Sequence, residues 1–315
     1  MIETLAVALI PIFFGLALGY FAGKFKIVDS INVRTLMTFV MNFALPCALF
    51  SSIVKVPRTV LLGQGNTIWI LAVVYLLIFF ATYFYGRSVA GESPKDASVL
   101  AMTVSFPNIT AVGIPLLDAT YGSYTGMLVA IGLAVGTLTI SPLGLVILEG
   151  NRTDHHATSP VAHFASAIVR TVRRPVVWAP VLGIVFALCN LSLPAFVMRS
   201  LSVMGAATAG AALFLTGLIV SARSLSFDAT VILGALAKNV IQPALCLGIG
   251  LLVHMPHQLL AALVLTVAIP SGFFGIVFGK SFDASPQSAS SGLVYSYILS
   301  ILSLGGWIVV LGRIG

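Results

Sequence analysis

The sequence predicts an all-α integral membrane protein with ten transmembrane helices, arranged as two inverted repeats of five helices each. Three observations predict this fold: the composition, the length of the apolar segments, and motifs that recur between the two halves. The chain has 315 residues, of which 59% are hydrophobic and only 8% are charged, whereas soluble domains carry about 25% charged residues. The mean hydropathy is +1.09. The apolar segments have the length of spanning helices rather than of barrel strands.

Each predicted span is close to the roughly 20 residues that a helix needs to cross a bilayer. The spans are expected at residues 3–23, 34–54, 67–86, 97–120, 125–148, 177–197, 201–221, 229–253, 258–279 and 290–312. A hydrophilic insert, 149–176, separates the first repeat, 1–148, from the second, 177–315. Its segment SPVAHFASAIVRTVRR begins with proline, has apolar residues at helical spacing and ends in arginines. This pattern predicts a short helix on the membrane surface; a flexible linker is the alternative.

The positions of Lys and Arg predict the orientation. With the N-terminus outside, the outer side holds Lys55, Arg58, Arg199 and Arg313. The inner loops then hold Lys24, Lys26, Arg34, Arg87, Lys95, Arg152, Arg170, Arg173, Arg174, Arg223 and Lys280. The positive-inside rule therefore places both termini outside and the 149–174 loop in the cytoplasm. We expect a multi-pass protein of a bacterial inner membrane, and the net charge of +7 indicates topology rather than a nucleic-acid partner.

Three pairs of segments recur in the same order in both halves. VSFPNITAVGIP (104–115) aligns with VAIPSGFFGIVF (267–278), which pairs Pro107 with Pro270 and Asn108 with Ser271. ALFSSIV likewise aligns with ALFLTGLIV, and IPIFFGLALG with APVLGIVFAL, at nearly the same separation. Because five spans is an odd number, the second copy would enter the membrane from the opposite side, as in many secondary transporters.

The prolines of the first pair of segments predict the site. Proline inside a helix removes a backbone hydrogen bond, and the freed groups need partners in hydrocarbon. We therefore expect broken helices in spans four and nine that meet near the midplane and turn their positive N-termini toward an anion. The candidate substrate-binding residues are Ser105, Pro107, Asn108, Thr110, Pro270, Ser271 and Gly272, with Asn42 from span two. Ordinary proline kinks that help packing are the alternative.

Two ionisable residues within spans are candidates for coupling transport to an ion. Lys238 lies about ten residues into span eight, and a charge at such depth is by default functional; a structural hydrogen-bonding role is the alternative. Asp118 is the deepest carboxylate, toward the outer end of span four, where an interfacial role is the alternative. No cofactor or metal site is expected, and the coupling ion would be H⁺ or Na⁺.

Taken together, the motifs resemble those of the auxin efflux carrier family. They are PIFFG in span one, TFVMNFALPCALF in span two, the Pro-Asn of span four and RRPVVWAPVLGIV after the basic insert. The family includes bacterial malonate and malate permeases and the plant PIN-FORMED auxin carriers. The resemblance implies a fold related to bile-acid and sodium/proton antiporter transporters. Spans 1, 2, 6 and 7 would form a scaffold, through which a homodimer would form. Spans 3–5 and 8–10 would form a transport domain that moves like an elevator.

The resemblance also bears on the substrate. In the plant carriers an asparagine follows each crossover proline and contacts the substrate carboxylate; Asn108 keeps this residue, whereas Ser271 replaces the second one. Phe106 and Leu49 also depart from the plant pattern, which favours an organic acid other than auxin.

We therefore expect a permease or efflux carrier of a small organic anion such as malonate, malate or an auxin-like carboxylate. A sodium-coupled symporter of the bile-acid type and, less favoured, an anion channel are the alternatives. An enzyme is not expected, because no span pairs a histidine or two acids with a nucleophile.

Overall fold

The structure, a computed structural model, describes residues 2–28, 30–121, 126–151, 160–222, 224–284 and 286–314. Within these ranges every regular element is a helix. Six helical segments are long and apolar enough to cross a membrane: Val33–Ile53, Gly65–Ser88, Met127–Gly150, Ala195–Ser221, Ala229–Leu252 and Gln287–Ile314. Shorter apolar helices at Ile10–Lys24, Pro175–Leu188 and His257–Ala268 accompany them. The predicted all-α membrane protein is confirmed at this level.

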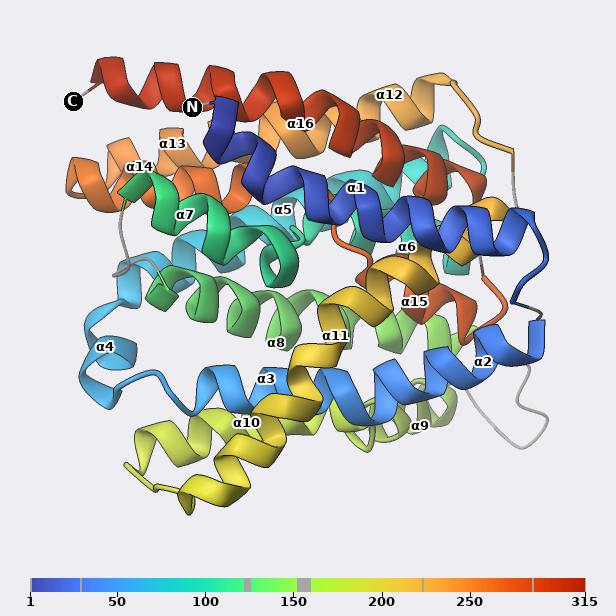
Figure 1. Cartoon of the computed structure of the whole chain (residues 1–315), viewed down its shortest axis with the longest axis horizontal. Helices are drawn as coiled ribbons and strands as arrows, with labels where there is room; N and C mark the ends of the chain where they lie inside the picture. Colours follow the sequence, from blue (N-terminus) through green and yellow to red (C-terminus); the bar gives the residue numbers. More distant parts are fainter. Residues whose placement is uncertain are drawn as a thin grey trace.

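The first half contains both long continuous helices and interrupted ones (Figure 1). They are α1 (Ile2–Lys24), α2 (Ser30–Phe39), the π-helical segment η1 (Val40–Ala44), α3 (Leu45–Ile53), α4 (Arg58–Gly63), α5 (Gly65–Ser88), α6 (Pro94–Ser105), η2 (Ile109–Gly113), α7 (Ile114–Tyr121) and α8 (Gly126–Gly150). The short helix α4 was not predicted.

The second half begins after the short helix that was expected in the insert. Its elements are α9 (Pro160–Val172), α10 (Pro175–Leu188), α11 (Ala195–Ser221), α12 (Ala229–Leu236), η4 (Ala237–Ile241), α13 (Gln242–Leu252), α14 (His257–Ala268), α15 (Phe274–Lys280) and α16 (Gln287–Ile314). The presence of α9 confirms a helix within the insert.

One predicted boundary is wrong. The spans expected at 177–197 and 201–221 are instead α10, which ends at Leu188, and the longer helix α11. Asn190 adopts the left-handed conformation, with φ of 53°, which is typical of residues that end a helix. Pro194 is the N-cap of α11, so the residues after it belong to the next helix.

The helices pack in two groups. In one group α1 packs against α11, and α3 packs against both α10 and α11. Gly217 allows α1 and α11 to approach closely, because a Cβ atom there would lie 2.7 Å from the backbone nitrogen of Tyr20. Small residues serve this purpose in membrane helix packing. In the other group α5 packs against α6 and α8, α13 against α14, and α12 against α16.

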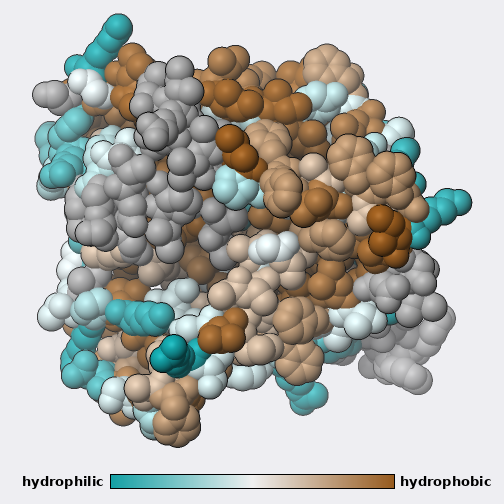
Figure 2. Space-filling model, in the orientation of Figure 1, coloured by the Kyte–Doolittle hydropathy of each residue, from teal (hydrophilic) through white to brown (hydrophobic). Residues whose placement is uncertain are grey.

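Hydrophobic side chains cover the middle of the molecule, whereas hydrophilic ones gather mainly toward its two ends (Figure 2). Large side chains are exposed along several helices, for example Phe14 at 63%, Phe84 at 59% and Leu302 at 77%. Soluble monomers rarely expose large contiguous apolar patches, so this surface is suited to lipid. In Figure 1 both termini lie toward the left end and α9 lies toward the right.

An ion-pair cluster joins α8 to the helices that follow it. The Glu149 carboxylate is buried at the end of α8, rather than in the insert, and it accepts hydrogen bonds from Arg170 Nε at 3.1 Å and from an Arg174 guanidinium nitrogen at 2.6 Å. The Arg174 guanidinium also lies 4.7 Å from the centre of the Phe282 ring. This cluster therefore fixes the path of the chain between the two halves.

Candidate functional site

Two helices are interrupted at the prolines that the sequence singled out, and the interruptions lie against each other. α6 ends at Ser105 and α14 at Ala268. Between the breaks, Pro107 and Ser271 form an isolated antiparallel bridge. Figure 1 shows α6 and α15 toward the right and α7 and α14 toward the left of this crossing. The prediction that spans four and nine are broken and meet is confirmed.

The two breaks satisfy each other's backbone groups. Asn108 N–H donates to the Pro270 carbonyl at 2.9 Å, and Gly272 N–H donates to the Phe106 carbonyl at 2.8 Å. These bonds satisfy backbone groups that have no partner within their own helix once α6 and α14 end. Gly272 is needed for the approach, because a Cβ atom there would lie 2.5 Å from the Phe106 carbonyl oxygen.

Asn108 and Ser271 are both buried at the crossing, with 0% and 1% exposure. Asn108 Nδ2 lies 2.6 Å from the hydroxyl oxygen of Tyr297 on α16. Asn108 Oδ1 has no hydrogen-bond partner among the residues that the structure describes. The crossing is therefore closed to solvent in this conformation, and it holds a polar amide whose bonding capacity is only partly used.

A second asparagine supports the other break through a serine. Ser271 N–H donates to Ser296 Oγ at 3.0 Å, and Ser296 Oγ donates to Asn239 Oδ1 at 2.6 Å. Asn239 Nδ2 in turn donates to the Ser296 carbonyl at 2.9 Å. The sequence analysis assigned no role to Asn239 or Tyr297, although Asn239 directly follows Lys238.

Lys238 joins the ends of the two broken helices. It is fully buried in η4, and its Nζ donates to the Val267 carbonyl at 2.8 Å and to Gln242 Oε1 at 2.7 Å. Gln242 Nε2 then donates to the Ser105 carbonyl at 2.7 Å. Both carbonyls belong to the last turns of α14 and α6, where helices leave acceptors unpaired and carry partial negative charge. The lysine and glutamine therefore satisfy both helix C-termini at once.

The structure does not bring every predicted residue to this place. Ser105, Pro107, Pro270 and Gly272 lie at the breaks with Asn108 and Ser271, and the Ser105 hydroxyl donates to the Ala101 carbonyl of its own helix at 2.7 Å. Asn42 instead has an exposed side chain on η1, and no hydrogen bond of the described residues joins it to the crossing. The side chains of Thr110 and Asp118 lie outside the described residues.

No group of three or more His, Cys, Asp or Glu residues that could hold a metal ion occurs among the residues that were searched, which are the described ones.

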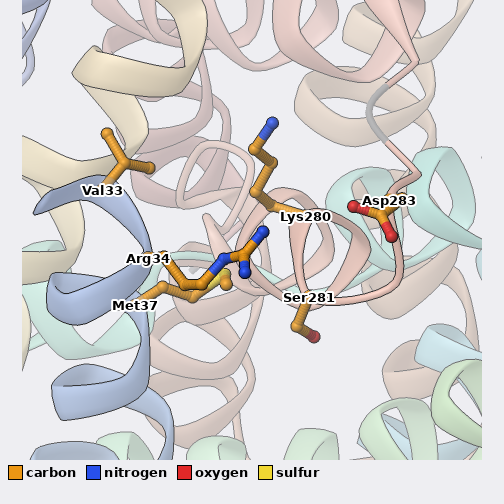
Figure 3. A pocket seen from close by; sticks show the side chains of 6 residues that line it. All are labelled: Val33, Arg34, Met37, Lys280, Ser281 and Asp283. Atoms are coloured by element: carbon orange, nitrogen blue, oxygen red, sulfur yellow. The ribbon is translucent and has the colours of Figure 1, made fainter. Parts of the chain in front are cut away.

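A cavity of about 370 Å³ lies between α2 and the turn after α15 (Figure 3). It is lined by Val33, Arg34, Met37, Lys280, Ser281 and Asp283. Figure 3 shows Arg34 extending from α2 toward the turn that carries Lys280 and Ser281. Neither cation forms an ion pair with an acidic residue in the described part of the chain. The cavity therefore combines two positive charges from two different elements with one carboxylate, that of Asp283.

Six apolar helices of spanning length among the described residues, together with the shorter helices α6 and α14 that end at buried polar groups, define a multi-pass membrane protein of the transporter class. The chain belongs to the family described as membrane transport protein, whose model matches residues 4–308. This family includes the auxin efflux carriers, so the resemblance drawn from the motifs is confirmed.

Three relatives are similar along nearly the whole chain. The uncharacterized transporter YfdV of Escherichia coli is 29% identical over 306 residues, which cover 96% of each protein. An uncharacterized transporter of Methanothermobacter thermautotrophicus is 26% identical over 307 residues, covering 93% of this chain and 94% of the relative. Auxin efflux carrier component 8 of Arabidopsis thaliana is 20% identical over 346 residues, covering 93% and 94%.

Proposed function

We propose that this membrane transport protein is a secondary transporter of a small organic anion such as malonate, malate or an auxin-like carboxylate. The observation that carries the proposal is the buried crossing of two broken helices, where the Asn108 amide keeps unused hydrogen-bonding capacity. Discontinuous helices that meet in this way form the substrate site in many secondary transporters. The auxin efflux carriers among the relatives favour a carboxylate as the substrate class.

The proposed architecture is a pair of inverted five-helix repeats. Two features support it: the order of elements is similar in the two halves, and equivalent helices have equivalent neighbours. α1 packs on α11 as α10 packs on α3, and α5 packs on α6 as α13 packs on α14. In this proposal α1, α2–α3, α10 and α11 form the scaffold, and α5–α8 with α12–α16 form the transport domain.

Transport would then proceed by an elevator-like shift of the transport domain. Because Asn108 and Ser271 are buried in this conformation, a substrate reaches them only when the domains move. The cavity at Arg34 and Lys280 lies between a scaffold helix and the end of a transport-domain helix. We assign this cavity to the cytoplasmic route of the anion, since the Lys and Arg distribution places both residues inside.

Lys238 is proposed to act as a resident positive charge rather than as a titrating coupling group. Its ammonium is bonded to one helix C-terminus directly and to the other through Gln242. A bound Na⁺ would stabilise the same negative helix ends. Because Lys238 already stabilises them in this proposal, a sodium-coupled symporter is the less favoured alternative. Uptake that requires Na⁺ would favour the symporter. A dependence of the uptake rate on a pH gradient would indicate coupling to H⁺, for which Asp118 is the candidate carboxylate.

The proposed setting is a bacterial inner membrane, with both termini outside and the 149–174 loop in the cytoplasm. The termini lie toward one end of the molecule and α9 toward the other (Figure 1), which supports this arrangement. The partners are the lipid bilayer and, through the scaffold helices, a second copy of the chain.

Counterflow in proteoliposomes tests the function. Vesicles that hold the purified protein are preloaded with unlabelled malonate, malate or indole-3-acetate and then given the same compound in labelled form. A carrier shows transient accumulation of label that depends on the preload. Uptake that is insensitive to preloading would indicate a channel, and no uptake of any carboxylate would contradict the proposed substrate class.

A further inference from the structure

A second cavity lies between the segment that follows α3 and the turn between α10 and α11. Its volume is about 330 Å³, within the roughly 300–1,000 Å³ that ligand pockets occupy. Residues 54–58 form one wall, and the end of α10, the loop 190–193 and Met198 of α11 form the other. No described residue of the crossing or of its broken helices lines this cavity, so it is separate from the proposed substrate site.

The cavity is positively charged. Lys55 and Arg58 line it, and no carboxylate is among its described lining residues. Lys55 Nζ donates to Ser202 Oγ of α11 at 3.4 Å, so this side chain reaches from one wall to the other. Arg58 forms no ion pair with the described residues. Asn190 and Ser192 add neutral polar groups, and the cavity is therefore suited to an anion with several acceptor oxygens.

These cations lie on the side where a membrane protein usually has few. In the predicted orientation the outer side holds only Lys55, Arg58, Arg199 and Arg313, as the positive-inside rule requires. Two of these four line the cavity, and Arg199 directly follows its lining residue Met198. Because topology does not require cations here, their concentration at one cavity calls for another reason, and an anionic ligand supplies one.

The surroundings of the cavity favour a lipid over a dissolved anion. Leu191 lines the cavity and is 50% exposed, and Phe196, between the lining residues Leu193 and Met198, is 73% exposed. Figure 1 shows α4 toward the end of the molecule that carries both termini, where the chain meets one surface of the membrane in the proposed orientation. A phospholipid uses both the cations and the apolar side chains beside them, whereas a dissolved anion uses the cations alone.

We propose that this cavity binds the phosphate headgroup of an anionic phospholipid from the outer leaflet, with Lys55 and Arg58 as its two charged contacts. The planar guanidinium of arginine can bind two phosphate oxygens at once, and the lysine ammonium acts as a point charge beside it. The segment 54–58 leads from α3 toward α5. A bound headgroup would therefore hold this connection against α10 and α11 and stabilise the folded protein.

The choice of ligand is tested by thermal unfolding of the purified protein in detergent, with phosphatidylglycerol or phosphatidylcholine added. A ligand that binds the folded state raises the unfolding temperature. Phosphatidylglycerol should raise it, whereas phosphatidylcholine, whose headgroup adds a positive charge to the same phosphate, should have little effect. Sodium phosphate at the same phosphate concentration is the third arm. Equal stabilisation by both lipids, or by inorganic phosphate and phosphatidylglycerol, would overturn the proposal.

The place of binding is tested with Lys55→Gln and Arg58→Gln, which change exposed side chains and should leave folding intact. Each basic side chain near an anionic headgroup contributes about fivefold in affinity. The double variant should therefore bind phosphatidylglycerol roughly twentyfold more weakly than the wild type, as measured by native mass spectrometry. Arg313→Gln changes an outer cation that does not line the cavity and should bind like the wild type.

A double variant that keeps the wild-type affinity, or a loss as large in Arg313→Gln, would overturn the site. Neither experiment measures transport, so a negative result here leaves the proposed function intact.

Discussion

At the scale of single residues, the two breaks are held by different chemistry. Asn108 brings an amide to the crossing and bonds Tyr297 through its side chain, whereas Ser271 is held through its backbone N–H by Ser296. The site is therefore asymmetric even though the two prolines align. Because amide donors come only from the first break, we expect Asn108 to dominate recognition of the anion.

Replacing Asn108 by alanine should lower carboxylate uptake at least tenfold, because the variant lacks both side-chain donors while the backbone bond to Pro270 remains. Initial rates in proteoliposomes at matched protein content measure the effect. Asn151→Ala, at an exposed asparagine at the end of α8, is the control and should transport normally. Unchanged kinetics of Asn108→Ala would remove this residue from the site.

Gly272→Ala should destabilise the crossing, because its Cβ atom would lie 2.5 Å from the Phe106 carbonyl oxygen. Overpacking of this kind costs about 1–3 kcal/mol, so the unfolding temperature in detergent should fall by several degrees. Gly248→Ala, where no atom lies within 4 Å of the added Cβ, should leave it equal or slightly higher. Equal unfolding temperatures for both variants would mean that the two breaks are further apart than described.

At the scale of helices, the sequence predicted where the two helices are interrupted but not which residues bond their C-terminal carbonyls. Pro107 and Pro270 are visible as prolines within apolar segments. The bonds from Lys238 to Val267, and from Gln242 to Ser105, join residues from different spans, and such pairings depend on packing rather than on local pattern. Lys238 was recognised only as an unusual charge.

The π-helical segment η1 bears on where Asn42 lies, and the substrate-binding role of this residue stays a prediction. A π-helical turn inserts an extra residue and rotates the following side chains around the helix axis. Asn42 lies inside η1, so a regular helical period places it on a different face from the exposed one that it occupies. The boundary near Pro194 was missed because the loop after α10, CNLSLP, carries no charge and is short.

Lys238→Met should keep the volume of the side chain but leave the Val267 carbonyl and Gln242 Oε1 without their donor. A buried group that loses its partner costs about 1–3 kcal/mol, so both the unfolding temperature and the transport rate should fall. Cys246 is a buried residue of the neighbouring α13 that takes no part in these hydrogen bonds. Cys246→Ala is therefore a control for disturbing the packing alone. A Lys238→Met variant as stable and active as the wild type would contradict the bridging role.

At the scale of the whole molecule, composition and motifs were sufficient for the class and the family, since both depend on properties of the entire chain. The direction of transport and the proposed movement between domains do not follow from any local pattern. The cavity between α2 and α15 is a feature of how two groups of helices fit together, and neither Arg34 nor Lys280 was distinguished from other loop cations in the sequence.

Arg34→Gln and Lys280→Gln should each raise the KM for a carboxylate about threefold to tenfold at low ionic strength, because the two cations outnumber the Asp283 carboxylate in the cavity lining and concentrate anions near its mouth. The effect should shrink as salt is added, since exposed charges are screened. Lys95→Gln, at a lysine that the positive-inside rule also places on the inner side but outside this cavity, should behave as the wild type. A KM that responds equally to all three substitutions would exclude a special role of the cavity.

The account depends on a crossing that opens to each side of the membrane in turn and holds the anion there. The most direct measurement is the labelling of Ser271→Cys, in a background without Cys47, Cys189 and Cys246, by a membrane-impermeant thiol reagent applied to either face of sealed vesicles. We predict labelling from both faces, slowed by a transported carboxylate. Labelling that occurs from one face alone, or that no transported carboxylate slows, would contradict the account.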